Sequence, residues 1–94
     1  MGSGGVPNRT IEVSYERRLK LTAKPNTRVD RYSRRDGKIL QSRWYDKNGK
    51  AERNRDYTTN NGKEKVPHDH TWDWSSNNGS RGREHLEPDY ENYY

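Results

Sequence analysis

Two histidines lie two residues apart in the segment KVPHDHTWDW, where they alternate with acidic and aromatic side chains. If this segment is a β-strand, its period of two places His68 and His70 on one face, with Trp72 and Trp74 further along the same face. Asp69 would then lie on the opposite face. At roughly 3.3 Å per residue, the two histidine Cα atoms would be about 7 Å apart. The spacing therefore predicts that two imidazoles project side by side from a strand.

Two imidazoles on one face of a strand can support several chemistries. They can bind a transition metal, or they can act as the base and the acid of RNA cleavage, because imidazole titrates near neutral pH. In a third arrangement one imidazole works while a carboxylate orients the other, and in a fourth both are surface residues beside packed tryptophans. A metal site needs three or four ligands, and because the chain has no cysteine the others would come from His85 or from carboxylates.

Metal-independent RNA cleavage needs the fewest groups, and the sequence favours it. His68 and His70 would move the protons of the 2′-hydroxyl and of the 5′-oxygen, with Asp56 close by. Lys65 or Arg55 would supply the cation that stabilises the phosphorane. The catalytic residues expected are thus His68, His70, Asp56 and Lys65, with neither a metal nor a cofactor. The residues expected to bind RNA are aromatic and basic: Tyr57, Trp72, Trp74, Arg43, Arg53 and Arg55.

Three turn signals indicate how these residues are positioned. Asp36–Lys38, Asn48–Lys50 and Asn61–Lys63 each centre on a glycine, and these glycines are 12 and then 13 residues apart. Asp-Gly and Asn-Gly pairs supply the positive φ angles that a tight hairpin needs. The turns predict an antiparallel meander with strands near residues 28–35, 38–46, 50–58 and 63–74.

A further alternating segment precedes the meander. Ile11, Val13 and Tyr15 would share one face of a strand, and residues 19–23 form a second alternating run. The intervening residues 16–18 break the phase, which predicts a turn or bulge between the two runs.

The composition limits how a core can form. Of 94 residues, 24% are hydrophobic, and the chain contains no phenylalanine. Seven tyrosines and three tryptophans can each bury roughly 150–250 Å². We therefore expect a mainly β domain, a small antiparallel meander or half-barrel with an aromatic core and at most one short helix near residues 81–87. Residues 1–5 are interpreted as an expression scar, residues 6–80 as the domain, and residues 81–94 as an acidic, tyrosine-rich tail, with mobile termini.

The charge distribution points to a polyanionic partner. The net charge is +5, and residues 28–55 hold ten Lys and Arg against four acids. Such a basic segment is typical of proteins that bind phosphates. The absence of cysteine excludes disulfides and thiolate catalysis, and no apolar run is long enough for a membrane span.

The segment from Arg43 to Trp74 resembles the C-terminal toxin domains of bacterial polymorphic toxins, in particular polymorphic toxin type 24. The pattern is a Tyr-Asp-x-x-Gly turn, a strand that ends in Asp-x-Asp-Tyr, a glycine-containing loop and Pro-His-x-His-x-Trp. Tyr45–Gly49, the pair Asp56 and Tyr57, and Pro67–Trp72 match these parts. Asn54 stands where the pattern has its first aspartate.

This resemblance implies a toxin tip of a larger secreted protein, a nuclease that acts on RNA in the cytoplasm of a target cell, and a cognate immunity protein. We expect it to be a monomer with no membrane partner. One alternative is a non-catalytic basic module that docks on nucleic acid or on an acidic protein in a phage or secretion assembly. Another is a structural tip of a cell-surface protein.

Overall fold

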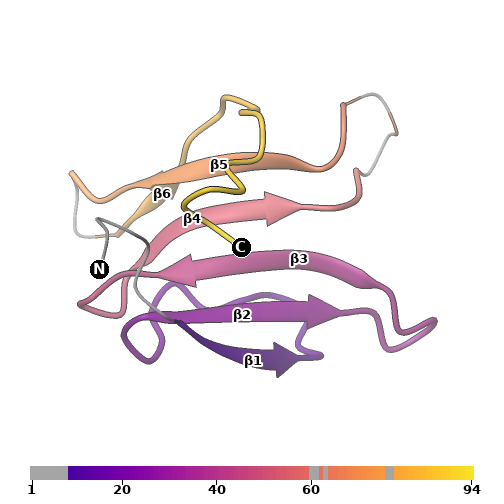
Figure 1. Cartoon of the computed structure of the whole chain (residues 1–94), viewed down its shortest axis with the longest axis horizontal. Coiled ribbons are helices and arrows are strands. Elements are labelled where there is room, and N and C mark those ends of the chain that lie inside the picture. The colour runs from indigo at the N-terminus through magenta and orange to yellow at the C-terminus, as the bar shows by residue number, and fades with distance from the viewer. Residues whose placement is uncertain (1–8, 60–61, 63, 76–77) are drawn as a thin grey trace.

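The computed structural model describes residues 9–59, 62, 64–75 and 78–94. Within these residues, six strands form one mixed sheet in which each strand lies beside the next in sequence (Figure 1). The strands are β1 (Thr10–Ser14), β2 (Thr27–Tyr32), β3 (Ile39–Tyr45), β4 (Ala51–Asp56), β5 (His68–Asp73) and β6 (Ser80–Arg81). The prediction of a mainly β domain is confirmed. The short helix expected near residues 81–87 is wrong, because that segment contains the end of β6 and an isolated bridge at Leu86.

The glycine turns organise the sheet as predicted from β2 to β5, and all of these neighbours are antiparallel. Gly37 and Gly49 have φ angles of 71° and 78°, which other residues rarely adopt. A Cβ at Gly49 would also collide with the carbonyl oxygen of Ala23. In the third turn Gly62 has a φ of 68°, whereas its neighbours at 61 and 63 lie outside the described residues.

The first strand departs from the antiparallel prediction. β1 pairs with β2 in parallel, with Thr10 opposite Thr27, and parallel neighbours cannot be joined by a tight hairpin. The connection instead passes over the β3–β4 turn, where the amide of Ala51 donates to the carbonyl of Leu21 (2.9 Å). The alternating run at residues 19–23 therefore forms one isolated bridge and no strand of its own.

The interior of the domain is mostly polar. Of the ten rings, all of which the structure describes, Trp44 and Tyr45 are buried, and Ala51 is the third buried hydrophobic residue. The expected aromatic core of ten rings does not form. The buried positions are filled instead by polar and charged side chains: Thr27, Asp30, Ser42, Arg43, Asn54, Arg55, His68, Asp69 and His70.

One face of the sheet carries Arg53, Arg55 and Asp69, and we call it the arginine face. Asp69, whose side chain is 0% exposed, accepts from Arg53 Nε (2.7 Å) and from Arg55 Nε and Nη2 (2.8 and 3.0 Å). Burial acts to raise the pKa of Asp69, but the hydrogen bonds from Arg55 and Arg53 outweigh it and the pKa is lowered. The guanidinium of Arg55 lies between the rings of Trp44 and Tyr90, 4.8 and 4.5 Å from their centroids. On this face the buried side chains are thus held together mainly by ion pairs and cation–π contacts, whereas most domains use apolar packing.

The C-terminal residues are packed against the arginine face. The Tyr93 ring meets Trp44 edge-on at 5.6 Å, and Arg55 Nη1 donates to the carbonyl of Tyr93 (2.9 Å). In Figure 1 this segment, drawn in yellow, crosses in front of β4. Tyr93, in the expected acidic tail of residues 81–94, therefore lies against the sheet, and the expected boundary at residue 81 falls inside β6.

Candidate histidine site

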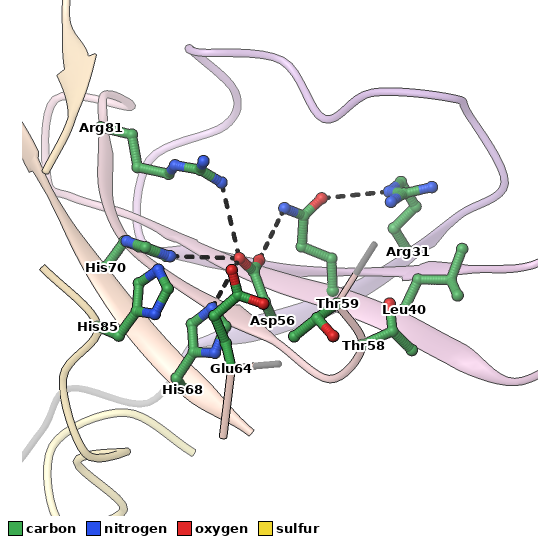
Figure 2. Close-up of a pocket in the computed structure, with 11 residues that line it drawn as sticks. Arg31, Leu40, Asp56, Thr58, Thr59, Glu64, His68, His70, Arg81 and His85 are labelled. Carbon is green, nitrogen blue, oxygen red and sulfur yellow. Dashed lines mark hydrogen bonds and ion pairs between the residues drawn. The ribbon is translucent and has the colours of Figure 1, made fainter. Parts of the chain in front are cut away.

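The opposite face, which we call the histidine face, carries His68, His70 and Asp56. As predicted from the period of two, both histidines project to one side of β5 while Asp69 projects to the other. β4 lies beside β5 with Asp56 opposite His68 and Asn54 opposite His70. The pairing therefore brings the carboxylate of Asp56 against both imidazoles (Figure 2).

The two oxygens of Asp56 have different surroundings. Oδ1 accepts from Gln41 Nε2 (3.0 Å) and from Asn54 Nδ2 (2.6 Å). Oδ2 lies 3.4 Å from Nε2 of His68 and 3.4 Å from Nε2 of His70. One oxygen is thus fixed by neutral donors, and the other faces the imidazoles.

The side chain of Asn54 is oriented by Arg43, which lies on the same face of the sheet. Its Oδ1 accepts from Nε of Arg43 (2.7 Å), and the Arg43 guanidinium lies over the Trp72 ring at 4.6 Å. Asn54 therefore supports Asp56 with an amide donor that an aspartate could not supply.

The backbone fixes the orientation of both imidazoles. His68 Nδ1 donates to the carbonyl of Lys65 (2.7 Å), and His70 Nδ1 donates to the carbonyl of Gly82 (2.9 Å). Because a carbonyl oxygen can only accept, each Nδ1 carries a hydrogen, and in a neutral ring Nε2 then directs a lone pair toward the cavity. Burial lowers the pKa of His70 and favours this neutral form. When both rings are neutral, two lone pairs and a carboxylate oxygen face one another, an arrangement that is stabilised when a proton or a cation lies between them.

His85 completes the cluster. Its ring is stacked on that of His68, with centroids 4.2 Å apart and planes 7° from parallel. Ligand atoms from His68, His70 and His85 lie within 4.8 Å of one another, so all three histidines of the chain meet here. The isolated bridge between Asp69 and Leu86, with two 2.9 Å hydrogen bonds, holds this segment beside β5.

These side chains line one cavity of about 340 Å³. Its lining is almost wholly polar: Arg31, Leu40, Gln41, Asp56, Thr58, Thr59, Glu64, His68, His70, Arg81 and His85. Two arginines face it: Arg81 Nη1 is 3.6 Å from Asp56 Oδ2, and Arg31 Nε donates to Gln41 Oε1 (3.2 Å). Glu64 contributes a buried Oε2 that has no hydrogen-bond partner among the described residues. The cavity thus contains acids, bases and cations in contact.

Among the predicted catalytic residues, the structure brings His68, His70 and Asp56 together and places Lys65 elsewhere. The Lys65 ammonium pairs with Glu87 at 2.7 Å, and its side chain is 76% exposed. The ammonium predicted to supply the cation therefore lies outside the cavity in this structure. Arg31 of β2 and Arg81 of β6 line the cavity, because their side chains project from the histidine face.

The predicted RNA-binding residues do not line the cavity. Arg53 and Arg55 lie on the arginine face, bound to Asp69, and the Tyr57 hydroxyl is 3.1 Å from Ser42 Oγ on that same side. Arg55 is therefore no candidate for the phosphorane cation either.

The remaining three of these residues are occupied elsewhere on the histidine side. Trp72 and Arg43 are stacked on each other, and Trp74 donates from Nε1 to the carbonyl of Ala51 (2.7 Å). Neither of these tryptophans lines the cavity, and Tyr57 does not line it either.

No protein-family model, curated protein or solved structure matches this chain. In the described part of the chain there is no helical segment with the length and hydrophobicity required to cross a bilayer.

Proposed function

We propose that this domain is an RNA-cleaving toxin domain whose reaction centre is the pair His68 and His70 with Asp56. The observation that carries the proposal is the convergence of both Nε2 atoms, each 3.4 Å from Oδ2 of Asp56, in a cavity with arginines at its edge. An acid and a base held beside one carboxylate oxygen are the parts that phosphodiester transesterification needs.

The chemistry follows from the fixed tautomers. One imidazole accepts the 2′-hydroxyl proton at Nε2, the 2′-oxygen attacks phosphorus, and the bond from phosphorus to the 5′-oxygen breaks. The other imidazole, protonated at Nε2, gives its proton to the leaving 5′-oxygen. Asp56 stabilises whichever ring carries the charge, and the two Nδ1 hydrogen bonds prevent the rings from turning. The products are a 2′,3′-cyclic phosphate and a 5′-hydroxyl.

Arg81 and Arg31 supply the positive charge for the phosphorane. Arg81 is half exposed and adjacent to Asp56, so it can reach a phosphate in the cavity. Guanidinium groups bind phosphate oxygens through paired hydrogen bonds. This assignment replaces Lys65 in the role of the phosphate-binding cation.

The biological setting rests on the resemblance of Arg43–Trp74 to polymorphic toxin type 24. The domain would be the end of a larger secreted protein, would act in the cytoplasm of a target cell, and would be neutralised by a cognate immunity protein. The net charge of +5 suits both RNA and an acidic inhibitor.

The test is incubation of the domain with a fluorescent RNA in EDTA, with analysis of the product ends. The wild type should release 2′,3′-cyclic phosphate ends, and His68→Ala or His70→Ala should slow cleavage by about 10²- to 10⁴-fold. Thr71→Ala is the matched control, because Thr71 is exposed on the same strand and projects away from the cavity.

Circular dichroism should show that all variants keep the β signature. Cleavage at the wild-type rate by the His68→Ala/His70→Ala double variant would remove the histidines from the reaction. RNA binding that is sensitive to salt but leads to no cleavage would favour the non-catalytic module instead.

A further inference from the structure

We infer that the same cluster is a binding site for one divalent transition-metal ion of the Zn²⁺ type, with His68, His70, His85 and Asp56 as ligands. The binding of this ion rests on coordination geometry and does not depend on RNA cleavage. Neutral imidazole nitrogens and a carboxylate oxygen are donors that Zn²⁺ prefers.

The first observation is a distance. When ligands lie about 2.0–2.2 Å from a tetrahedral Zn²⁺, two of them are about 3.3–3.5 Å apart. Oδ2 of Asp56 lies 3.4 Å from Nε2 of His68 and 3.4 Å from Nε2 of His70. These separations are long for a hydrogen bond, and they equal the edges of a tetrahedral site.

The second observation is the support behind each ligand. Imidazoles that bind metals usually donate their other ring N–H to a carbonyl or carboxylate, which fixes the tautomer. His68 and His70 do this through Nδ1, toward the carbonyls of Lys65 and Gly82. Asp56 is fixed by Gln41 and Asn54 through the oxygen that does not face the histidines. Three ligands are therefore oriented before an ion arrives.

The third observation is an unpaired carboxylate oxygen. Oε2 of Glu64 is buried and has no hydrogen-bond partner among the described residues, and Glu64 lines the cavity. A buried carboxylate oxygen without a donor is costly unless a cation is nearby. It therefore adds to the attraction of the cavity for a divalent ion.

His85 is the ligand that must move. A ring stacked on His68 with planes 7° from parallel cannot direct its in-plane lone pair at the same ion as His68. The His85 side chain is exposed and forms no hydrogen bond within the described residues, so it can turn out of the stack. Ion binding should therefore break the stack between His68 and His85.

Arg81 opposes the ion. Its Nη1 lies 3.6 Å from Oδ2 of Asp56 and its side chain is half exposed, so a cation at Asp56 must displace it. Loss of this guanidinium should tighten metal binding, whereas loss of a ligand should weaken it. Substitution of Arg81 and substitution of a ligand should therefore change the Zn²⁺ affinity in opposite directions.

The experiment is isothermal titration of tag-free protein with Zn²⁺, with Co²⁺ as the spectroscopic probe and no RNA present. The wild type should bind one ion, and Co²⁺ should show the intense visible absorption of a tetrahedral site. His85→Ala and Asp56→Asn should each weaken Zn²⁺ binding by roughly tenfold or more, the lower range seen when even supporting residues are lost. Arg81→Ala should strengthen it, and Mg²⁺, which requires oxygen ligands, should give no heat of binding.

Asp73→Asn is the matched control, because Asp73 is an exposed carboxylate on the same strand outside the cavity, and its Zn²⁺ affinity should equal that of the wild type. Because the chain contains three histidines and all are in the cluster, imidazole ¹⁵N spectra report the site directly. The ¹⁵N signals of all three rings should shift when one ion binds.

The inference is overturned if no ion binds, or if His85→Ala and Asp56→Asn bind as tightly as the wild type. Neither result bears on cleavage in EDTA, so failure of the metal site and failure of the proposed nuclease are distinguishable.

Discussion

The substitution Asp69→Asn tests whether buried charge holds this domain together. Asp69 is 0% exposed and Arg55 2% exposed, and the carboxylate receives one hydrogen bond from Arg53 and two from Arg55. Asparagine keeps the shape of the side chain but removes its charge. It also replaces one carboxylate oxygen with an amide NH₂ group, a donor that would face a guanidinium. Two arginines would then be left without their counter-ion.

The expected magnitude follows from the loss of one partner of a buried pair, which typically costs about 3–5 kcal/mol. A domain of this length has a total unfolding free energy of roughly 5–14 kcal/mol, at about 0.05–0.15 kcal/mol per residue. Asp69→Asn should therefore remove a large share of the stability. With a urea m-value of about 1–1.5 kcal/mol/M, the unfolding midpoint should fall by at least about 2 M.

Urea unfolding followed by tryptophan fluorescence measures this change, since Trp44 lies against Arg55. Asp73→Asn makes the same chemical change on an exposed residue of the same strand and should lose less than about 0.5 kcal/mol. If Asp69→Asn costs less than about 1 kcal/mol, or no more than Asp73→Asn, the charged network is not a main source of stability. A double variant, Arg55→Met with Asp69→Leu, should be more stable than Asp69→Leu alone, because no unpaired charge remains at Arg55.

Three further outcomes are expected. Zn²⁺ at saturating concentration should suppress RNA cleavage and EDTA should restore it, because the ion occupies both Nε2 lone pairs that the proposed reaction uses; a requirement for Zn²⁺ in the cleavage assay would contradict the metal-free mechanism. Arg81→Ala should lower the cleavage rate by about 10²-fold, as loss of a transition-state donor does, while the urea midpoint stays unchanged; an unchanged rate would exclude Arg81 from phosphate binding. Gly49→Ala should lower the unfolding free energy by more than about 1 kcal/mol, because the φ of Gly49 is positive and a Cβ there would collide with Ala23. Gly37→Ala, which has open space around the added Cβ, should lower the unfolding free energy less in the same urea assay.

Much of the meander and half of the site could be predicted from local patterns. The alternation around His68 and His70 determines their common face, and the glycine turns determine the order of β2 to β5, because both are properties of neighbouring residues. The direction of β1 could not be read in this way, since alternation is the same in parallel and antiparallel strands. His85 reaches the site through a bridge between Asp69 and Leu86, a contact that leaves no local signal.

The polar composition misled the prediction of the core for a physical reason. Few aliphatic residues and ten rings indicate an aromatic interior. Composition shows how much apolar surface the side chains can bury, but it does not show which charged side chains will be buried as pairs. Arg55 and Asp69 have the same polarity in the sequence whether they are exposed or paired, and their pairing depends on the register of β4 with β5. Arg53 and Arg55 are predicted to bind RNA because the sequence shows their charge. It does not show that the register places Asp69 beside them as a counter-ion.

Strand β5 has two roles because its side chains alternate. Asp69 holds two arginines on one face, and His68 and His70 meet Asp56 on the other. A shift of one residue in the pairing of β4 with β5 would exchange these faces, leaving Asp69 without its arginines and the imidazoles without their carboxylate. The buried ion network thus makes the wrong register costly, and this cost keeps the two Nε2 atoms directed at one oxygen. The stability of the fold and the affinity of the site for Zn²⁺ should therefore fall together in any variant that disturbs the register. Substitutions at His85 or Arg81, which lie outside this pairing, should change the Zn²⁺ affinity without changing the stability.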